Sequence, residues 1–262
     1  GLNGLGLCST QYSSEYMDVE IHRDGFKYNL HFEKGENVGG LKKEPYSGKK
    51  SGTKTRWKPD LEVFTSINIA KEYFTEVLKK QAVVNPKVTF VFKYENEDGT
   101  FDTEEFYYEN GISDYLKEIV GDNHLTSLQY WEGERKGRDR EDKPEYKVKL
   151  SVAFTFSNKV KLLEYYHNSS FLEHGGSPDK AVSRAFLSAI DGYLKAGNKY
   201  NKGEKAIKWE DVSECLVLIS SSFSTMTSYE NQTKKAITNV FIKDAMTEFL
   251  KHNLEIYFIE NP

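Results

Sequence analysis

The chain has 262 residues, of which 38% are hydrophobic and 14% aromatic, with a mean hydropathy of −0.66 and a formal net charge of −4. This length allows one large domain or two modest ones, and no apolar run approaches the roughly 20 residues that a membrane helix needs. The small negative charge gives no overall attraction to nucleic acid, so any such contact would need a local basic patch. The two cysteines, Cys8 and Cys215, are far apart and predict buried thiols rather than a disulfide, which fits a reducing cytoplasm.

The first part of the chain predicts alternating strands and helices. A glycine run at residues 1–6 precedes a short helix, and Asp24-Gly25 turns a hairpin whose strands alternate apolar and polar side chains. A short strand follows at 53–57, and a helix over 69–78 has an apolar stripe at helical spacing. The remaining elements expected here are strands at 88–94 and 105–108 and a helix at 112–120.

The pattern resets near residues 121–123, where we expect a domain boundary. Beyond it, a long strand alternates over 148–156, an apolar run at 215–219 predicts a buried strand, and a last helix covers 241–250. The segment 132–149 mixes charges of both signs and predicts a solvated connection. The sequence therefore predicts two α+β units.

The strongest helix signal begins at Ser177. Serine is a favoured N-cap residue, Pro178 suits the first helical position, and Gly197 suits the end of a helix. An apolar stripe with helical spacing runs between them, so this helix should pack on the core of the second unit.

One segment, residues 42–58, is strongly basic. Two interpretations stay open: a solvated loop, or a contact with a phosphate backbone that would be independent of base sequence and sensitive to salt. Its seven cations face a single acid, Glu44; they are Lys42, Lys43, Lys49, Lys50, Lys54, Arg56 and Lys58.

Two short motifs could bind phosphate. Glycines let backbone N–H groups approach phosphate oxygens, and a helix N-terminus adds a partial positive charge, so residues 1–6 could cradle an anion. A glycine run also occurs in any flexible loop, and this one is neither a P-loop nor a dinucleotide-binding fingerprint. Lys234, in Gln232-Thr233-Lys234, is either a phosphate ligand or an exposed lysine beside Lys235. The six histidines show no metal-ligand spacing.

Seven blocks in a fixed order resemble the B subunits of bacterial type IIA DNA topoisomerases (DNA gyrase and topoisomerase IV). The blocks are Gly1-Leu2-Asn3-Gly4-Leu5-Gly6, Gly52-Thr53-Lys54-Thr55-Arg56-Trp57-Lys58-Pro59, Asn85-Pro86, Tyr108-Glu109-Asn110-Gly111-Ile112, Glu210-Asp211-Val212-Ser213-Glu214-Cys215-Leu216, Gln232-Thr233-Lys234 and Glu260-Asn261-Pro262. The series covers nearly the whole chain. Three departures indicate a divergent member: Asn3 and Cys215 replace the family's histidine and glycine, and residues 174–178 replace an acid-Gly-Gly-Thr-His pattern.

The resemblance implies a fold and an activity. Residues 1–121 would be the C-terminal part of a GHKL ATPase sandwich, and residues 122–262 would be a transducer domain like that of a ribosomal protein. In the family, ATP with Mg²⁺ closes two B subunits into a homodimer that traps DNA, and hydrolysis resets this gate while the A subunit cuts and reseals DNA. The implied protein is cytoplasmic and has no membrane contact.

The resemblance also assigns residue roles. Lys234 would reach the γ-phosphate and Gln232 would hydrogen-bond the same phosphate or the lid. Thr53 would lie near the adenine. The backbone amides of the lid would cradle the phosphates; these belong to Asn3, Gly4, Leu5 and Gly6.

The family's catalytic glutamate, its magnesium-binding asparagine and its adenine-reading aspartate lie upstream of the lid, and the 262 residues contain no recognisable substitute. We therefore expect the chain by itself to bind ATP poorly and hydrolyse none. Two alternatives stay open: another GHKL ATPase such as a mismatch-repair protein, or a non-enzymatic DNA-binding or dimerisation module.

Overall fold

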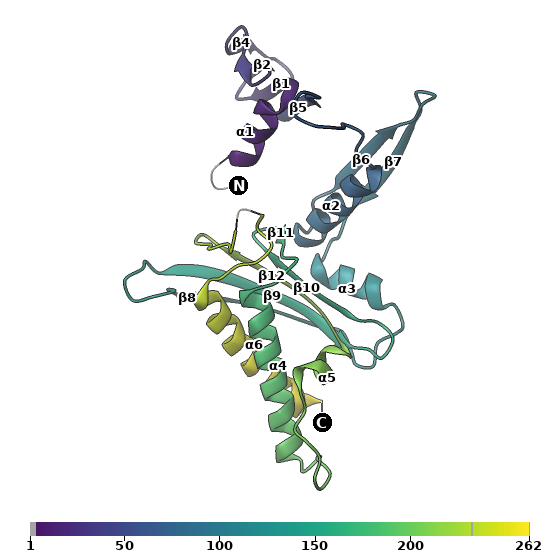
Figure 1. Cartoon of the computed structure of the whole chain (residues 1–262), viewed down its shortest axis with the longest axis vertical. Helices are drawn as coiled ribbons and strands as arrows, with labels where there is room; N and C mark the ends of the chain where they lie inside the picture. The colour runs from purple at the N-terminus through teal and green to yellow at the C-terminus, as the bar shows by residue number, and fades with distance from the viewer. Residues whose placement is uncertain (1–3, 232, 262) are drawn as a thin grey trace. The chain divides into compact units, whose positions relative to one another are not determined.

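The computed structural model describes residues 4–231 and 233–261, and its contacts divide the chain into two compact units, 1–71 and 72–262 (Figure 1). The boundary near residue 121 that the resemblance implies differs from this division, and it stays a prediction about the family's domains. No described helix is long and apolar enough to cross a membrane.

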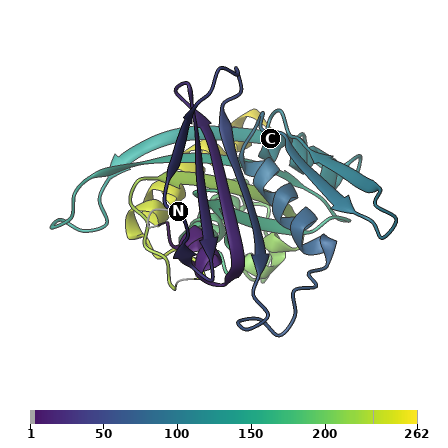
Figure 2. The ribbon, with the colours of Figure 1, turned by 90° about the horizontal axis from the view of Figure 1, so that it is seen from above.

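The first unit is one short helix beside an antiparallel sheet of five strands in the order β3-β2-β1-β5, with β4 also paired to β2 (Figure 2). The predicted hairpin is confirmed, because Val19 pairs with Leu30 and Ile21 with Tyr28 across the Asp24-Gly25 turn. The elements are α1 (Leu5–Tyr12), β1 (Ser14–Arg23), β2 (Phe26–Glu33), β3 (Glu36–Asn37), β4 (Lys42–Pro45) and β5 (Gly52–Pro59).

Alternation gives this sheet one charged and one apolar face. Asp18 and Glu20 of β1 lie opposite Arg56 and Lys54 of β5, on the face away from Val19. Segment 42–58 is therefore more ordered than a solvated loop, since most of it forms β4 and β5.

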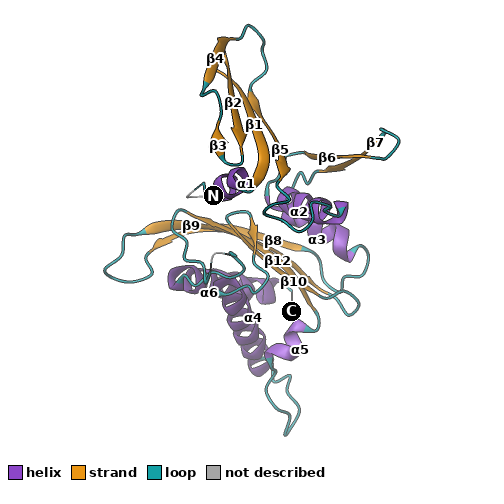
Figure 3. Ribbon diagram, turned by 45° about the horizontal axis from the view of Figure 1, so that its top comes forward, coloured by secondary structure: helices purple, strands orange, loops and turns teal. Residues whose placement is uncertain are grey.

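The second unit is built on a curved, mixed five-stranded sheet in the order β11-β10-β12-β9-β8 (Figure 3). Only β10 and β12 run parallel, and the connection between them contains α4. A separate two-stranded ribbon pairs β6 with β7. The elements are α2 (Lys71–Val84), β6 (Phe90–Glu95), β7 (Phe101–Phe106), α3 (Ile112–Val120), β8 (Gln129–Gly137), β9 (Tyr146–Phe156), β10 (Leu162–His167), β11 (Ser170–Phe171), α4 (Ser177–Ala196), α5 (Trp209–Ser213), β12 (Leu216–Ser224) and α6 (Val240–Glu260).

Both faces of this sheet are covered. α4 and α6 pack on one face, where Leu150 and Leu218 join Phe186 and Leu250 in a core. α3 lies against the other face (Figure 3). There, Ile219 and its neighbours form a second core with Leu116 of α3 and Val83 of α2. The run 215–219 is apolar throughout because alternate residues of β12 face different cores.

The predicted elements at 112–120, 148–156 and 241–250 are confirmed as α3, β9 and α6. The helix predicted over 69–78 is confirmed as α2, which runs from Lys71 to Val84, but most of its apolar stripe is exposed. This unit buries Ala82 to Val84 at the C-terminal end of the helix, whereas Tyr73 and Val77 are 70% and 58% exposed. α2 contacts the second core through its last turn only. Helical spacing therefore predicted that a helix forms here, but it did not show which of its residues are buried.

The segment 132–149 is a connection only over residues 138–145, because the rest of it belongs to β8 and β9. On the edge strand β8, Glu134 and Lys136 are exposed whereas Arg135 is half-buried. Glu134 binds Lys147 of β9 at 2.8 Å, and Lys136 binds Glu145, which precedes β9, at 3.0 Å. Charges on an edge strand discourage pairing with further strands. The prediction failed because mixed charge suits an exposed edge strand as well as it suits a loop.

Candidate functional site: an uncapped helix start and an anchored lysine loop

The N-terminal motif forms the start of α1. Gly4 stands at the N-cap position with φ 62°, a left-handed conformation that glycine adopts without strain. No side chain caps this helix end and no acid lies in its first turn. An added Cβ at Gly4 or Gly6 would meet no atom within 4 Å. The first amides of α1 are therefore open to an anion, whereas Asn3 lies outside the described residues.

Thr53 lies on β5 and is exposed, where it pairs with Ile21 near the far end of β1 from α1. Among the described residues, no hydrogen bond joins Thr53 to residues 4–6. Its predicted place near the adenine stays a prediction.

Lys234 stands at the tip of a loop whose two sides pair with each other. Tyr229 and Ile237 form an antiparallel bridge, and the Glu230 amide donates to the Ala236 carbonyl at 3.0 Å. Asn231 closes the tip, because its carbonyl accepts from the Lys234 amide at 3.2 Å. We call residues 228–238 the lysine loop.

The ammonium of Lys234 is available for a ligand. In the described part of the loop it forms no ion pair, and its Nζ lies 5.6 Å from the centre of the Tyr229 ring. Lys235, in contrast, pairs with Glu173 at 2.5 Å. The backbone of Lys234 has φ 58°, an uncommon conformation for a residue with a side chain. Gln232 lies outside the described residues.

The lysine loop is anchored to the start of α4 by a close backbone approach. Gly176 bridges Ile237, and an added Cβ at Gly176 would lie 2.2 Å from the Ile237 carbonyl oxygen. The Ser177 amide donates to the same oxygen at 2.9 Å, and its hydroxyl donates to the Asn239 carbonyl at 2.8 Å. The predicted N-cap role of Ser177 is wrong: Gly176 takes that position without a side-chain bond, and Ser177 binds the loop instead.

A buried polar network holds the other end of the loop. The Asp139 carboxylate accepts from Asn239 Nδ2 at 3.0 Å, from the Tyr146 hydroxyl at 3.0 Å and from the Phe241 amide at 2.9 Å. Burial, followed by the hydrogen bond to Asp139, raises the pKa of Tyr146 above its ordinary value. Asn239 also accepts from the Ser228 amide at 2.7 Å. A carboxylate at the start of α6 is favoured by the helix dipole.

Sequence reasoning missed Asp139, Gly176 and Asn239 as supports of the lysine loop. Their contacts connect positions 60 to 100 residues apart in the chain, so no local pattern could indicate them. Only the Gly175-Gly176 pair signalled an unusual backbone.

A buried histidine, His167, lies at the end of β10. His167 is fully buried and bonds Ser222 Oγ through Nδ1 at 2.8 Å and Thr227 Oγ1 through Nε2 at 2.9 Å. Burial lowers the pKa of His167 from 6.5 to about 4. This side chain is therefore neutral at pH 7 and ties the start of the segment that leads into the lysine loop.

We expect this histidine to make folding sensitive to acid. Between pH 6.5 and 4 the unfolded chain binds a proton that the folded chain does not, so stability is complete above pH 6.5 and falls as the pH drops toward 4. The loss should reach about 2 kcal/mol at pH 5. Urea unfolding of the wild type and His167→Gln at pH 7 and pH 5 checks this. Equal losses in the two proteins would show that His167 is not responsible.

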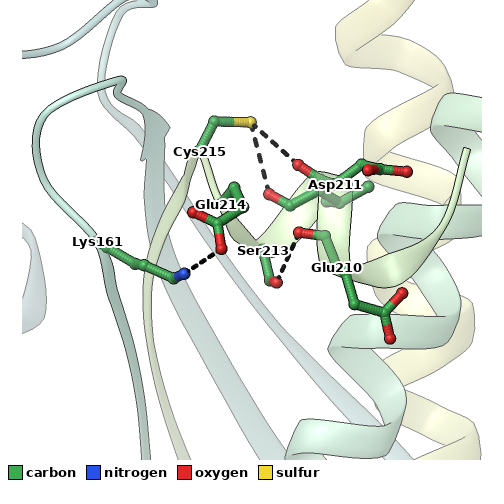
Figure 4. Close-up of polar contacts among 7 residues, drawn as sticks. Lys161, Glu210, Asp211, Ser213, Glu214 and Cys215 are labelled. Carbon is green, nitrogen blue, oxygen red and sulfur yellow. Dashed lines mark hydrogen bonds and ion pairs between the residues drawn. The ribbon is translucent and has the colours of Figure 1, made fainter.

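The segment before β12 forms α5 (Figure 4). Cys215 Sγ lies 3.5 Å from the Val212 carbonyl oxygen and 3.9 Å from that of Asp211, and Glu214 pairs with Lys161 at 2.5 Å. Burial raises the pKa of the Cys215 thiol, which makes it a poor nucleophile. Both cysteines are free, but Cys8 is exposed, so the prediction of two buried thiols is wrong for Cys8.

With this geometry in place, comparison with known proteins decides the family. The DNA gyrase B family model matches residues 111–262. The chain belongs to the DNA gyrase B family. This confirms the resemblance that the seven sequence blocks predicted.

Two relatives show how much of such a protein is present. The DNA gyrase B subunit of Chlamydia muridarum is 25% identical over 265 residues, which cover 100% of this chain and 32% of the relative. The DNA topoisomerase 4 B subunit of Streptococcus pneumoniae is 25% identical over 266 residues, or 100% of this chain and 39% of the relative. The chain thus spans about a third of the length of these relatives.

Solved structures agree on the fold. The topoisomerase IV ATP-binding domain of Francisella tularensis, in complex with a small-molecule inhibitor, has a TM-score of 0.76 at 22% identity and covers 99% of this chain and 68% of that one. The 43K ATPase domain of Thermus thermophilus gyrase B, in complex with an aminocoumarin, has a TM-score of 0.71 at 21% identity, with coverage of 100% and 68%. The predicted α+β fold of a gyrase B ATPase region is confirmed.

Proposed function

We propose that this chain is the ATP-gate and transducer portion of the B subunit of a type II DNA topoisomerase. Its role would be to couple ATP binding and hydrolysis to closure of a B-subunit dimer and to DNA strand passage, with a topoisomerase A subunit as partner. The observation that carries the proposal is the anchored lysine loop in a chain of the gyrase B family.

Two groups of described residues are suited to bind the phosphates of a nucleoside triphosphate. The start of α1 offers uncapped amides with open space at Gly4 and Gly6, and a helix N-terminus favours phosphate. Lys234 offers an ammonium without an ion pair in the described loop. ATP would supply the phosphates that these groups bind.

Lys234 is the residue to which we assign γ-phosphate contact, and Gln232 would assist it. An ammonium is a compact, rotatable charge that binds a terminal phosphate well. The lysine loop is fixed at its base by Gly176, Ser177 and Asn239, so a force on its tip is transmitted to α4 and α6. Presence or loss of the γ-phosphate would thereby act on α4 and α6 through the base of the loop.

Mg²⁺ is a different case. Among residues 4–231 and 233–261, no group of three or more His, Cys, Asp or Glu side chains could hold a metal ion. We therefore assign no step to the metal within this chain. Our proposal assigns neither a magnesium ligand nor a general base to a described residue.

The proposal is tested with a chimera. The part of the Chlamydia muridarum gyrase B subunit that precedes its matched region would be joined in front of Gly1. ATP turnover by the folded chimera, with none by the 262-residue chain alone, supports the assignment. Robust turnover by the chain alone would refute the view that the base and metal ligand lie elsewhere.

A further inference from the structure

The first unit carries cations that its own acids leave unpaired. In the described range from Gly4 to Ala70, five exposed cations have no ion pair: three on the charged face of the sheet and two on the loop between β4 and β5. They are Lys42, Lys54 and Arg56, and Lys49 and Lys50. We call these five the basic strip. Lys43 is excluded because it lies over the Phe26 ring at 3.8 Å, on the other face. Each of the remaining lysines and arginines in that range forms an ion pair, such as Lys27 with Glu20 at 2.9 Å.

Three members of the basic strip, Lys42, Lys54 and Arg56, line a groove on the charged face of the sheet. Lys42 comes from β4 at one edge of the sheet, and Lys54 and Arg56 come from β5 at the other edge. Lys49 and Lys50 lie on the loop that joins these two strands. The groove has a volume of about 300 Å³ and is lined by Asp18, Glu20 and His31 among others.

The loop that carries Lys49 and Lys50 is held in place. The Tyr46 ring packs on His22 with 4.2 Å between ring centres, and the Tyr46 amide donates to the Gly25 carbonyl at 2.8 Å. Gly48 allows a close approach, because an added Cβ would lie 2.2 Å from the Tyr46 ring. The two lysines are thus presented from an ordered turn.

The spacing of these cations fits a nucleic-acid duplex. β4 and β5 are three strand steps apart, about 14 Å at the usual strand separation. The major groove of a B-form duplex is about 12 Å wide. Cations at the two edges of the sheet can therefore contact phosphates on the two sides of one DNA groove. A single phosphate ion is too small to reach both edges.

The acids within the groove favour a duplex over a uniformly anionic surface. Asp18 bonds His31 at 2.7 Å and Glu20 pairs with Lys27, so both carboxylates remain between the two basic edges. A flat anionic membrane would press negative charge against them. A duplex carries its phosphates in two rows, one for each basic edge of the sheet. The DNA groove between these rows would then lie opposite Asp18 and Glu20.

We infer that the charged face of the β4-β2-β1-β5 sheet is a DNA-binding surface that contacts the phosphates of a duplex through the basic strip. The inference rests on the proposed function only for the choice of DNA as the nucleic acid. It is independent of Lys234 and of nucleotide.

The test is the salt dependence of binding to a labelled 20-base-pair duplex, followed by fluorescence anisotropy with the 262-residue chain. If four phosphates are neutralised, the association constant should fall about 150-fold between 50 and 200 mM salt. The variant Lys49→Gln/Lys50→Gln/Lys54→Gln/Arg56→Gln should bind at least 10-fold more weakly at 50 mM salt and lose most of this dependence. A circular-dichroism melt confirms that it folds.

A matched control removes four exposed lysines scattered over the second unit, Lys93, Lys117, Lys159 and Lys180, and should keep most of the salt dependence. Equal weakening by both variants would show that net charge alone governs binding and would overturn the inference. So would binding to vesicles containing 30% phosphatidylserine without binding to the duplex. A Lys234→Ala chain should bind the duplex as the wild type does, which separates this result from the nucleotide assignment.

Discussion

Replacing Lys234 by alanine should lower the ATP turnover number of the chimera by at least about 100-fold, because a charge placed against the γ-phosphate is worth about 3 kcal/mol. The ammonium has no ion pair among the described residues, so its loss leaves no buried partner and should not unfold the loop. Steady-state kinetics of the variant and its parent measure the effect.

Lys235→Ala is the matched control for that result. It removes the neighbouring charge and the pair with Glu173, which are both exposed to solvent, so turnover should change less than about 3-fold. Similar losses in the two variants would mean that the loop needs general positive charge and not Lys234 in particular. An unchanged Lys234→Ala enzyme would remove the γ-phosphate assignment.

The second large effect concerns the anchor of the lysine loop. Gly176→Ala should destabilise the second unit by about 3 kcal/mol, because the new Cβ would meet the Ile237 carbonyl oxygen at 2.2 Å and φ is 85°. In a unit of this size, that loss lowers the melting temperature by about 6–12 °C. Thermal unfolding followed by circular dichroism measures it.

Gly192→Ala provides the control within the same helix. An added Cβ there meets no atom within 4 Å, and alanine favours a helix, so this variant should be about 0.5–1 kcal/mol more stable. A Gly176→Ala protein that melts within about 1 °C of the wild type would show that the close approach to Ile237 does not hold the loop.

Local sequence patterns were sufficient for several elements of the fold. The alternation of Val19, Ile21 and Tyr28 around Asp24-Gly25 predicted the hairpin that β1 and β2 form. The γ-phosphate role of Lys234 stays a prediction. Local periodicity also located α4 and β9, because strands and helices with one buried face repeat at fixed intervals.

The misses share a physical cause. Asp139, Ser177 and Asn239 support the lysine loop through contacts between distant parts of the chain, and a local pattern contains no information about such contacts. β8 was missed because it contains many charged residues, which hide its alternation of half-buried and exposed side chains. Trp131 and Arg135 are two of the half-buried ones. The Gly175-Gly176 pair is visible in the sequence, but its function depends on where residue 237 lies.

The measurement that tests the central claim most directly is a calorimetric titration of the 262-residue chain alone with a non-hydrolysable ATP analogue and magnesium. Our account assigns to this chain the lid amides and Lys234 but not the rest of the nucleotide pocket, so it predicts no binding tighter than about 1 mM, or about −4 kcal/mol. Micromolar binding that Lys234→Ala abolishes would contradict it, because these residues would then form a complete nucleotide site by themselves.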